Sequence, residues 1–549
     1  MFSDPVVGSD FFGRQDILDL LIKRADSLKS GYRQNVAIIG HQQLGKTSIL
    51  RQFLHTYRDP AILAIYVEIK LQALDYFVDQ FIRSLLYQYL SERETLDPTE
   101  SLASLCQKAS PQIPKTVARI DEIATLLKNR RAEEAYTRLF ELTSIIKQET
   151  GKSCIVILDE FHRLGEFGVK NAFSNFGKRI MVQKDTMYLL SSSAFSASRK
   201  ILAEKLALLF GNFERIYLKA FDFPTSFEFL QKKLPPLSMS DSLKSFVVAL
   251  TDGHPFFLET IASRVKELSL AKTELEVSPR TVAEALQKVL YESQGPLNQY
   301  FLKLISPWTG PKSHGSHLLI LAALAKGKNK PKDIAMAVNR SQRETLRDLQ
   351  ELMANELLVK TGIFYRFHNK LFKFWLKEVY DKKDLSLLGT SAKAEDFLAS
   401  MEKHIAEHEE ISRMENGDRI VALFKSFQSE MVEFGEKKRQ LPHFTEFLSL
   451  IPSGSVVPPG ESYRNFLAKG HGRCWVCQIT DQKASEREIL ELVNAPAKEK
   501  SAPTKVLVAL RGLDENAKLL AKEKRVLTLG LSRINMLMDL YNQPPIIQR

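Results

Sequence analysis

The sequence predicts an α/β fold at the N-terminus, with a parallel sheet between layers of helices, followed by smaller helical, winged-helix and α/β domains. Two stretches of the chain carry this prediction. The glycine-rich stretch 40–47 lies between an apolar strand and an amphipathic helix, and the aliphatic run 154–158 ends in two adjacent carboxylates, Asp159 and Glu160. Such a run is typical of a central parallel strand that is buried on both faces. Ligands bind at the carboxyl ends of such strands, so we expect both stretches at one site.

The stretch 40–47 fits the P-loop pattern G-x-x-x-x-G-K-[ST] without a mismatch. Residues 35–39 supply the strand before it, and residues 47–57 supply a helix with apolar side chains at helical spacing. The glycines let backbone N–H groups turn toward phosphate oxygens, and the helix N-terminus adds a positive dipole. The expected ATP-binding residues of this loop are Gly40, Gly45, Lys46, Thr47 and Ser48. The alternative is a glycine-rich turn with an incidental lysine.

Four side chains of these two stretches are expected to bind and hydrolyse ATP. Lys46 should reach the β- and γ-phosphates, and the Thr47 hydroxyl should bind Mg²⁺. Asp159 should hold the same Mg²⁺, directly or through water, and Glu160 should polarise the attacking water as general base. Two adjacent acids favour hydrolysis over mere nucleotide storage. The alternative is a solvated acidic turn.

Further segments resemble, in their order along the chain, the archaeal-type ATPases of the STAND/AAA+ group, which are relatives of origin-recognition initiators and transposition regulators. The resemblance covers about residues 5–375 and implies an ATPase that binds ATP and Mg²⁺. It implies that Phe12, Gly13 and Arg14 lie near the adenine, and that Ser192 or Ser193 serves as sensor 1. His254 and Pro255 match the G-x-P turn of the lid. The segments that carry the resemblance are Phe11-Phe12-Gly13-Arg14, the strand 187–193 with its three final serines, the stretch 210–215, and Gly253-His254-Pro255.

Arg215 lies where such ATPases often carry an arginine that reaches a phosphate held by a neighbouring subunit, which implies ATP-dependent self-association. An arginine in this position stabilises charge in the transition state. The family pattern places glycine directly before this arginine, whereas Asn212, Phe213 and Glu214 intervene here. The alternatives are a surface arginine that pairs with Glu214, and Arg199 as the arginine in this role.

Composition allows several functions and excludes few. A chain of 549 residues should form several domains. Its net charge of +12 permits binding to nucleic acid without requiring it. No apolar run is long enough to span a membrane, and the first ten residues do not look like a signal peptide. Four cysteines argue against a disulfide framework, so we expect a cytoplasmic protein.

Residues 1–225 are expected to form the ATPase core, with a helical insertion at 70–150 that is either a partner surface or extra packing. Within this insertion, the stretch 97–114 is expected to be looser. An all-helical lid is expected at 226–310, and it would close over the nucleotide and pass its state to later domains. Strands of the core are expected at 35–39, 62–69, 154–158, 187–191 and 216–218.

Residues 311–380 are expected to form a winged helix. Its helices should be 318–324, one that opens at Pro331, and one that begins at the capping box of Ser341 and Glu344. Residues 357–367 alternate in polarity as a wing hairpin would.

On the third helix, Gln342, Arg343 and Arg347 face outward, as a recognition helix requires. We expect these side chains to contact double-stranded DNA, and the segment 315–380 indeed holds more Lys and Arg than Asp and Glu. The alternative is a winged helix that contacts a protein.

A charged helical connector is expected at 381–440, and an α/β domain at 441–549. Its three strands are expected at 474–479, 505–510 and 526–529, and its two helices at 485–493 and 515–524. This last domain resembles the restriction-endonuclease-like domain that often follows such ATPases. The resemblance implies an inactive copy, because Gln478-Ile479-Thr480 has threonine where the nuclease motif has lysine, and Glu461 is the only nearby acid. His471, Cys474 and Cys477 have a spacing that zinc sites use, but they supply only three ligands. Buried free cysteines are the alternative.

Three functions remain. The first is an ATP-hydrolysing conformational switch that acts on or with DNA, in mobile-element regulation, replication or defence. The second is a STAND-type signalling or scaffold NTPase whose C-terminal modules bind proteins. The third is an ATP-dependent nuclease, which the missing lysine disfavours.

Overall fold

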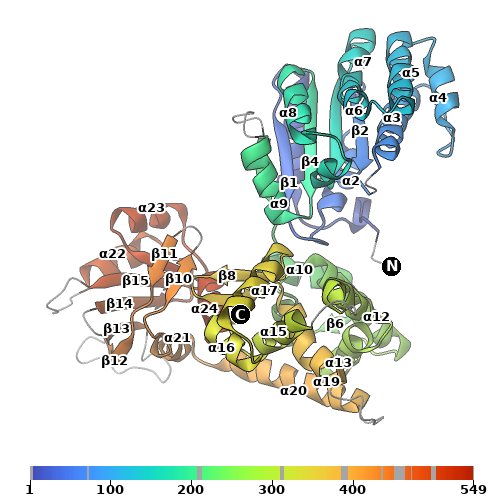
Figure 1. Cartoon of the computed structure of the whole chain (residues 1–549). Helices are drawn as coiled ribbons and strands as arrows, with labels where there is room; N and C mark the ends of the chain where they lie inside the picture. The colour runs from blue at the N-terminus through green and yellow to red at the C-terminus, as the bar shows by residue number, and fades with distance from the viewer. Residues whose placement is uncertain are drawn as a thin grey trace. The chain divides into compact units, whose positions relative to one another are not determined.

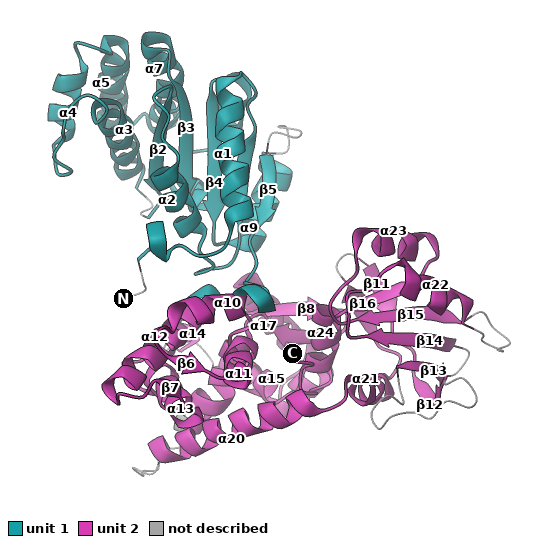
Figure 2. Cartoon of the chain, turned by 180° about the vertical axis from the view of Figure 1, so that it is seen from behind, with its two compact units in different colours: residues 1–225, 254–256 teal, residues 226–253, 257–549 magenta. Residues whose placement is uncertain are grey.

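A computed structural model of the chain describes residues 4–70, 73–206, 213–309, 315–384, 393–434, 437–450, 464–470, 473–495 and 503–547. The chain divides into two compact units (Figure 2), namely residues 1–225 with 254–256, and residues 226–253 with 257–549. Among the described residues, none of the helices combines the length and the apolar character that a membrane span needs.

The first unit contains a parallel sheet of five strands in the order β2-β3-β4-β1-β5, of which β1, β2 and β4 are labelled in Figure 1. This confirms the predicted α/β P-loop fold class. In the sheet, Ile39 pairs with Ser192 and Leu158 pairs with Leu190, so the ends of β1, β3 and β4 lie together. The strands are β1 (Asn35–Ile39), β2 (Ile62–Glu68), β3 (Ser153–Asp159), β4 (Thr186–Ser192) and β5 (Phe213–Tyr217).

Alternate side chains of these strands enter two separate cores. Helices α1 (Gln15–Lys29) and α2 (Lys46–Thr56) pack on the face that carries Ile38 and Ile157. The predicted insertion covers the other face, where Phe81 and Phe140 are fully buried, so it builds half of the core. Its helices are α3 (Leu74–Leu90), α4 (Leu102–Ala109), α5 (Pro114–Lys128), α6 (Ala132–Leu139) and α7 (Leu142–Thr150), and α8 (Ala172–Val182) packs beside them.

The stretch 97–114 was expected to be loose, yet it contains α4. Ser101 caps this helix, because its hydroxyl accepts a hydrogen bond from the backbone N–H of Ser104. The short helix has an apolar face that buries Leu105 and Ala109, and this burial stabilises a helix where a looser stretch was expected.

The second unit begins with helices, as expected for the lid 226–310, but two short parallel strands, β6 (Ser238–Met239) and β7 (Glu276–Val277), interrupt them. The helices are α10 (Phe223–Lys233), α11 (Asp241–Thr251), α12 (Pro255–Ala271), α13 (Pro279–Leu286) and α14 (Pro296–Ile305).

Three helices and a hairpin follow, in the order of a winged helix. They are α15 (Ser316–Ala325), α16 (Pro331–Ala337), α17 (Gln342–Ala354), β8 (Leu358–Thr361) and β9 (Phe364–Phe367). The predicted capping box is present: Ser341 accepts from the N–H of Glu344, whose carboxylate accepts from the N–H of Ser341.

The segment 381–440 is not helical throughout, which corrects the expected connector. Helices α20 (Lys393–Arg413) and α21 (Asn416–Lys425) are followed by an antiparallel hairpin, β10 (Met431–Phe434) with β11 (Lys437–Gln440). Val432 and Phe434, two residues apart on one face of β10, enter the core that α21 shares with the last domain. Their burial there favours a strand although the charged composition of the segment suggested a helix.

The last domain holds a mixed sheet of five strands in the order β12-β13-β14-β15-β16, whereas three strands were expected. The additional strands β12 (Phe444–Ser449) and β13 (Asn465–Gly470) are antiparallel to their neighbours, and helix α24 (Leu531–Leu540) closes the domain. The predicted elements are β14 (Arg473–Thr480), α22 (Glu486–Asn494), β15 (Thr504–Ala509), α23 (Glu515–Glu523) and β16 (Leu527–Gly530).

The cysteines of β14 are buried on opposite faces of this sheet. Cys474 enters the core under α22 and α23, while Cys477 enters the core under α21 and α24. A single metal ion cannot bind both, which agrees with the reading as buried free cysteines. His471 and Glu461 lie outside the described residues.

We expect one buried histidine to make the second unit sensitive to acid. His408 of α20 lies against the ring of Phe246, with Nε2 3.3 Å from the Ser245 hydroxyl, and burial lowers its pKa to about 4. As the pH falls from 6.5 toward 4, the unfolded chain binds a proton that the folded chain does not, so stability is lost in this window.

The expected loss is about 1–2 kcal/mol at pH 5. His408→Gln should therefore lose less thermal stability than the wild type between pH 7.5 and pH 5.0. The control is His55→Gln, at an exposed position of α2. An equal shift of Tm in the wild type and in His408→Gln would contradict the assignment.

Candidate functional site

The P-loop connects β1 to α2 through residues in the left-handed region of the backbone. Gly45 has φ +91°, and Gln43 has φ +60°. Gly40 cannot carry a side chain without movement, because a Cβ there would lie 2.8 Å from the carbonyl oxygen of Leu218. Lys46 is buried, and its Nζ donates a 2.7 Å hydrogen bond to the carbonyl of His41 within the loop. The lysine is thus already turned toward the concave side of the P-loop.

Asp159 ends β3 as a buried carboxylate with four hydrogen-bond donors. Oδ2 accepts from the Thr47 hydroxyl at 2.7 Å and from the Tyr66 hydroxyl at 3.0 Å. Oδ1 accepts from the Ser191 hydroxyl and, at 3.1 Å, from the backbone N–H of Glu160. The structure therefore brings together the two residues predicted to bind Mg²⁺. Their hydroxyl and carboxylate oxygens are the hard donors that Mg²⁺ prefers, so the donor set fits this ion.

Glu160 follows in the left-handed region, with φ +60°. Its Oε2 accepts from the backbone N–H and from the hydroxyl of Ser193, each at 2.8 Å. The Nδ1 atom of His162 lies 3.3 Å from the same oxygen. Positive φ in a glutamate costs free energy, and such strain is common where a side chain must be aimed.

Three serines, the last two residues of β4 and the residue after it, contact three different groups at or just after the end of β3. Ser191 binds Asp159, Ser192 lies 2.8 Å from His162 Nδ1 through its hydroxyl, and Ser193 binds Glu160. The sequence singled out Ser192 and Ser193, and the structure places both beside the acidic pair. Sequence reasoning missed Ser191 and His162. Both could have been found, because Ser191 begins the run of three serines and His162 lies two residues after Glu160.

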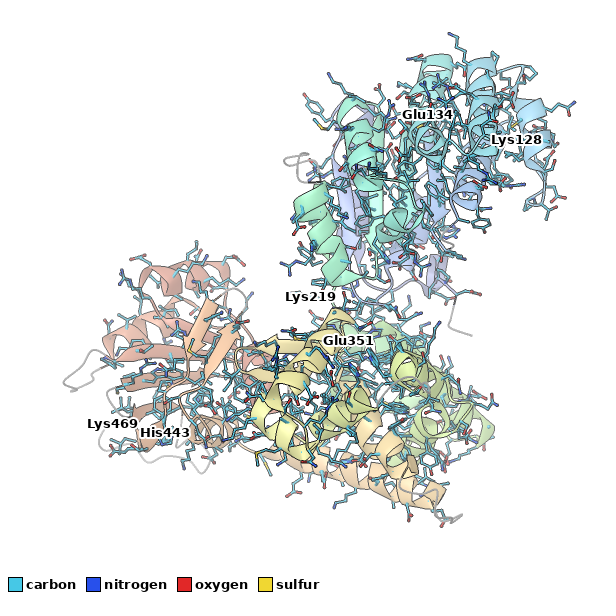
Figure 3. All side chains as sticks on the ribbon, viewed as in Figure 1. Lys128, Glu134, Lys219, Glu351, His443 and Lys469 are labelled. Atoms are coloured by element: carbon cyan, nitrogen blue, oxygen red, sulfur yellow. The ribbon has the colours of Figure 1, made fainter. Side chains whose placement is uncertain are left out.

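The box before α1 packs against the segment that follows β5. The guanidinium of Arg14 lies 4.7 Å from the ring centre of Phe221 and donates to the carbonyl of Lys219, which is labelled in Figure 3. Burial lowers the pKa of Arg14. Phe12 meets Phe221 edge to face at 6.0 Å, and Gly13 adopts φ +67°.

A short N-terminal segment lies on α2, which sequence reasoning also missed. The N–H of Val6 donates to the Ser48 hydroxyl at 3.1 Å, and the N–H of Gly8 donates to Gln52 Oε1 at 2.7 Å. Ser48 therefore contacts the chain that leads into the box at Phe12.

Arg215 lies exposed on the edge strand β5 and donates to the carbonyl of Leu202 at 3.3 Å. The expected alternative, a pair with Glu214, is wrong, because Glu214 binds Arg24 at 2.8 Å. Arg199 is also exposed, with its guanidinium 5.8 Å from the ring centre of Phe195. Residues 210–212 lie outside the described residues.

His254 directly precedes α12, and Pro255 is the first residue of this helix. Both residues, with Phe256, group with the first unit, whereas the chain on either side belongs to the second. Pro255 has the fixed φ that suits the first turn of a helix.

Within the second unit, α17 exposes the three side chains that were predicted to contact DNA, Gln342, Arg343 and Arg347. Its opposite side is fixed by a buried carboxylate: Asp348 accepts from the Ser316 hydroxyl at 2.8 Å and from Arg340 at 3.0 Å. The exposed face is therefore carried by a helix that is anchored at its cap and at its core.

The hairpin after α17 does not end in solvent. Its tip lies on β10, where the N–H of Ile363 donates to the carbonyl of Met431 at 3.1 Å. Phe364 belongs to the core of the last domain and lies 5.6 Å from the ring of Tyr541. Beside it, the buried Glu430 accepts from Lys330 at 2.9 Å and from the Tyr541 hydroxyl at 2.8 Å.

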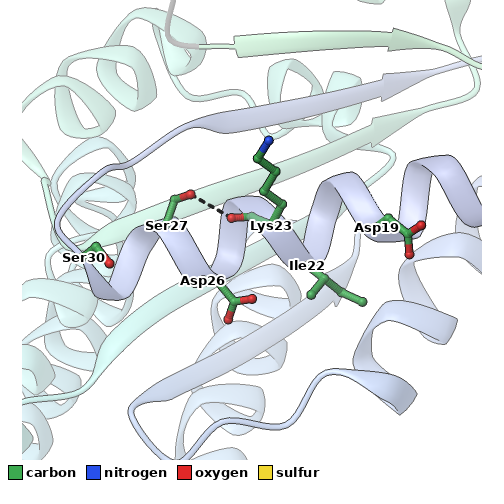
Figure 4. Close-up of a pocket in the computed structure, with 6 residues that line it drawn as sticks. All are labelled: Asp19, Ile22, Lys23, Asp26, Ser27 and Ser30. Carbon is green, nitrogen blue, oxygen red and sulfur yellow. Dashed lines mark hydrogen bonds between the residues drawn. The ribbon is translucent and has the colours of Figure 1, made fainter.

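An open depression lies on α1, and the residues that line it are drawn in Figure 4. It lies along the helix from Asp19 to Ser30, toward the end of α1 that leads into the start of β1, whereas the P-loop follows the other end of that strand. Among the described residues, no cluster of three or more His, Cys, Asp or Glu side chains is arranged to hold a metal ion.

Residues 10–176 match the family described as AAA ATPase domain. With the P-loop lysine, the threonine and the acidic pair assembled at the ends of β1 and β3, this match identifies the chain as an ATPase. No curated protein matches it.

Several solved structures are similar to this chain at low identity. The Walker-type ATPase PABY2304 of Pyrococcus abyssi is 17% identical, over 68% of this chain and 98% of that one, with a TM-score of 0.48. The ORC2 protein of Aeropyrum pernix is 12% identical, over 74% and 98%, with a TM-score of 0.44. The ORC1 protein of Aeropyrum pernix, solved in complex with DNA, is 13% identical, over 68% and 95%, with a TM-score of 0.38.

Proposed function

We propose that this ATPase is a conformational switch of the STAND/AAA+ type that acts on or with double-stranded DNA in the cytoplasm. The observation that carries the DNA part is the exposed face of α17, with Gln342, Arg343 and Arg347 on a helix that is capped and anchored. Arginines and glutamine on the N-terminal half of a recognition helix reach base edges and phosphates in the major groove. The four free cysteines fit a reducing compartment.

At the ATP site, Lys46 would hold the β- and γ-phosphates, while Thr47 and Asp159 would hold Mg²⁺. The ion would neutralise charge on the phosphates. Glu160 would take the proton of the attacking water, and its Oε2 is already aimed by Ser193. Ser192 and Ser193 would report the state of the γ-phosphate to the acidic pair, since β4 lies between β3 and β1 in the sheet. Phe12, Gly13 and Arg14 would line the adenine end.

The switch itself would lie in the lid, 226–310, which contains the G-x-P turn with His254 and Pro255. Closure of such a lid on ATP and its release after hydrolysis change the orientation of whatever follows it. Arg215, or Arg199 in its place, would reach the phosphate of a second copy, so ATP would favour a homo-oligomer. Both arginines are exposed, as this role requires.

The covered wing favours one mode of DNA contact. A winged helix that uses its wing needs a free hairpin tip, whereas here Ile363 and Phe364 contact β10 and the last core. We therefore place the DNA contact on α17 and not on the wing. The same observation supports a second candidate function, a scaffold NTPase in which the winged helix and the last domain form one protein-binding module.

Duplex DNA should stimulate ATP hydrolysis at low salt, less at moderate salt, and not at all in Lys46→Ala. Arg343→Glu with Arg347→Glu should weaken duplex binding about tenfold or more, because two phosphate or base contacts become repulsive. The measurements are phosphate release and fluorescence anisotropy of a labelled duplex at both salt concentrations.

The matched control is Arg413→Glu on α20, since the Arg413 side chain is 74% exposed and that of Arg347 is 76% exposed. Duplex binding that is absent even at low salt would reject the DNA switch and leave the scaffold. Equal duplex binding by Arg413→Glu and by the double variant would show that the DNA interface does not lie on α17. Cleavage of the duplex would show that the last domain is an active nuclease.

A further inference from the structure

Tyr66 lies on β2, the strand next to β3, and its side chain reaches the acidic end of the neighbouring strand. The Tyr66 hydroxyl donates to Asp159 Oδ2 at 3.0 Å. The residue is fixed from two sides, because its backbone N–H donates to Ser84 of α3 at 3.0 Å and the guanidinium of Arg51 lies 4.0 Å from its ring centre. A guanidinium this close to an aromatic ring is attracted to its face.

The four donors on Asp159 are not equivalent. Ser191 and the Glu160 N–H act on Oδ1, and Thr47 and Tyr66 act on Oδ2. Thr47 is itself a proposed ligand of the metal ion, so it is part of the metal site and not a group outside it that orients Asp159. Tyr66 is then the donor that holds Oδ2 from outside this site.

The phenol is suited to this task because its hydroxyl is an uncharged donor that reaches Asp159 Oδ2. A neutral hydroxyl donates to a carboxylate without competing with it for a cation. A lysine or arginine at the same place would also orient Asp159, but its positive charge would repel Mg²⁺.

We infer that Tyr66 is a positioning residue for the divalent cation: its hydroxyl fixes the carboxylate of Asp159 in the direction that meets the Thr47 hydroxyl. The inference rests on the proposed metal-binding role of Asp159 and Thr47. It adds a residue of β2, outside both sequence motifs, to the groups that decide how well the site binds Mg²⁺. Groups that orient metal ligands in this way commonly control metal affinity.

The test is the Mg²⁺ dependence of nucleotide binding, followed with a fluorescent ADP analogue and no turnover. In Tyr66→Phe, which keeps the ring and its contact with Arg51, the Mg²⁺ concentration for half-maximal binding should rise about 3- to 10-fold, the net effect of losing one hydrogen bond. Binding in EDTA should be unchanged, and saturating Mg²⁺ should restore wild-type binding, which a folding defect would not allow.

Tyr57→Phe is the matched control, because the Tyr57 hydroxyl also donates to an aspartate, Asp26, at 3.2 Å. Asp159→Ala distinguishes the proposed metal site from the proposed role of Tyr66. If Asp159→Ala leaves the Mg²⁺ dependence unchanged, the proposed metal site is wrong. If Asp159→Ala changes it while Tyr66→Phe behaves like Tyr57→Phe, the metal site stands and the role of Tyr66 is overturned.

Discussion

Replacing Glu160 with glutamine is expected to lower the rate constant of ATP hydrolysis about 10²- to 10³-fold, the usual contribution of a general base. ATP should still bind, because the amide oxygen can accept the two hydrogen bonds that Ser193 donates to Glu160 Oε2 at 2.8 Å. The amide cannot take a proton from water, so chemistry should stop while the site stays assembled. Single-turnover phosphate release and binding of a fluorescent ATP analogue measure the two effects separately.

Glu68→Gln is the control, since Glu68 pairs with Asp159 in the register of β2 and β3 but its carboxylate binds Lys70 at 3.0 Å. This variant loses a nearby negative charge without touching the predicted base. If Glu160→Gln kept more than a tenth of the wild-type rate, another group would have to activate the water. A Glu160→Gln variant that failed to bind ATP would instead assign the carboxylate to nucleotide binding.

The sequence allowed the centre of this site to be predicted because its chemistry depends on fixed spacing. Lys46 and Thr47 follow the loop glycine Gly45 directly, and Asp159 and Glu160 come at the end of an aliphatic run that is typical of a buried parallel strand. Tyr66 had no such signal: its role depends on β2 lying beside β3, and the order of strands in a sheet is a long-range property. The pairing of Glu214 with Arg24, across 190 residues, was hidden for the same reason.

The later domains show the same division between local and long-range information. The capping box at Ser341 and the hairpin 358–367 were predictable, because a few neighbouring residues determine them. The hairpin β10–β11 was read as helix because its charged residues mask the inward pair Val432 and Phe434. These two side chains become strand residues only when α21 and the last sheet supply a core for them.

Replacing Gly362 with valine is expected to destabilise the second unit by about 3 kcal/mol or more. Gly362 has φ +67°, a conformation that a β-branched residue adopts only with strain. A Cβ would also overlap the carbonyl oxygen of Met431 and lie 2.7 Å from Cα of Val432, and neither backbone atom can rotate away. Thermal unfolding and hydrogen exchange of β10 should both report the change.

Gly512→Val separates strain from contact, because Gly512 has φ +78° with no atom within 4 Å of a Cβ built there. Strain alone should cost about 1–2 kcal/mol in each variant, so the excess in Gly362→Val measures how strongly the β8–β9 hairpin tip is held on β10. Equal losses would mean that this tip can move off β10 at no cost. An excess would mean that the hairpin contact, together with the ion pair of Lys330 and Glu430, couples helices α15 to α17 to the last sheet.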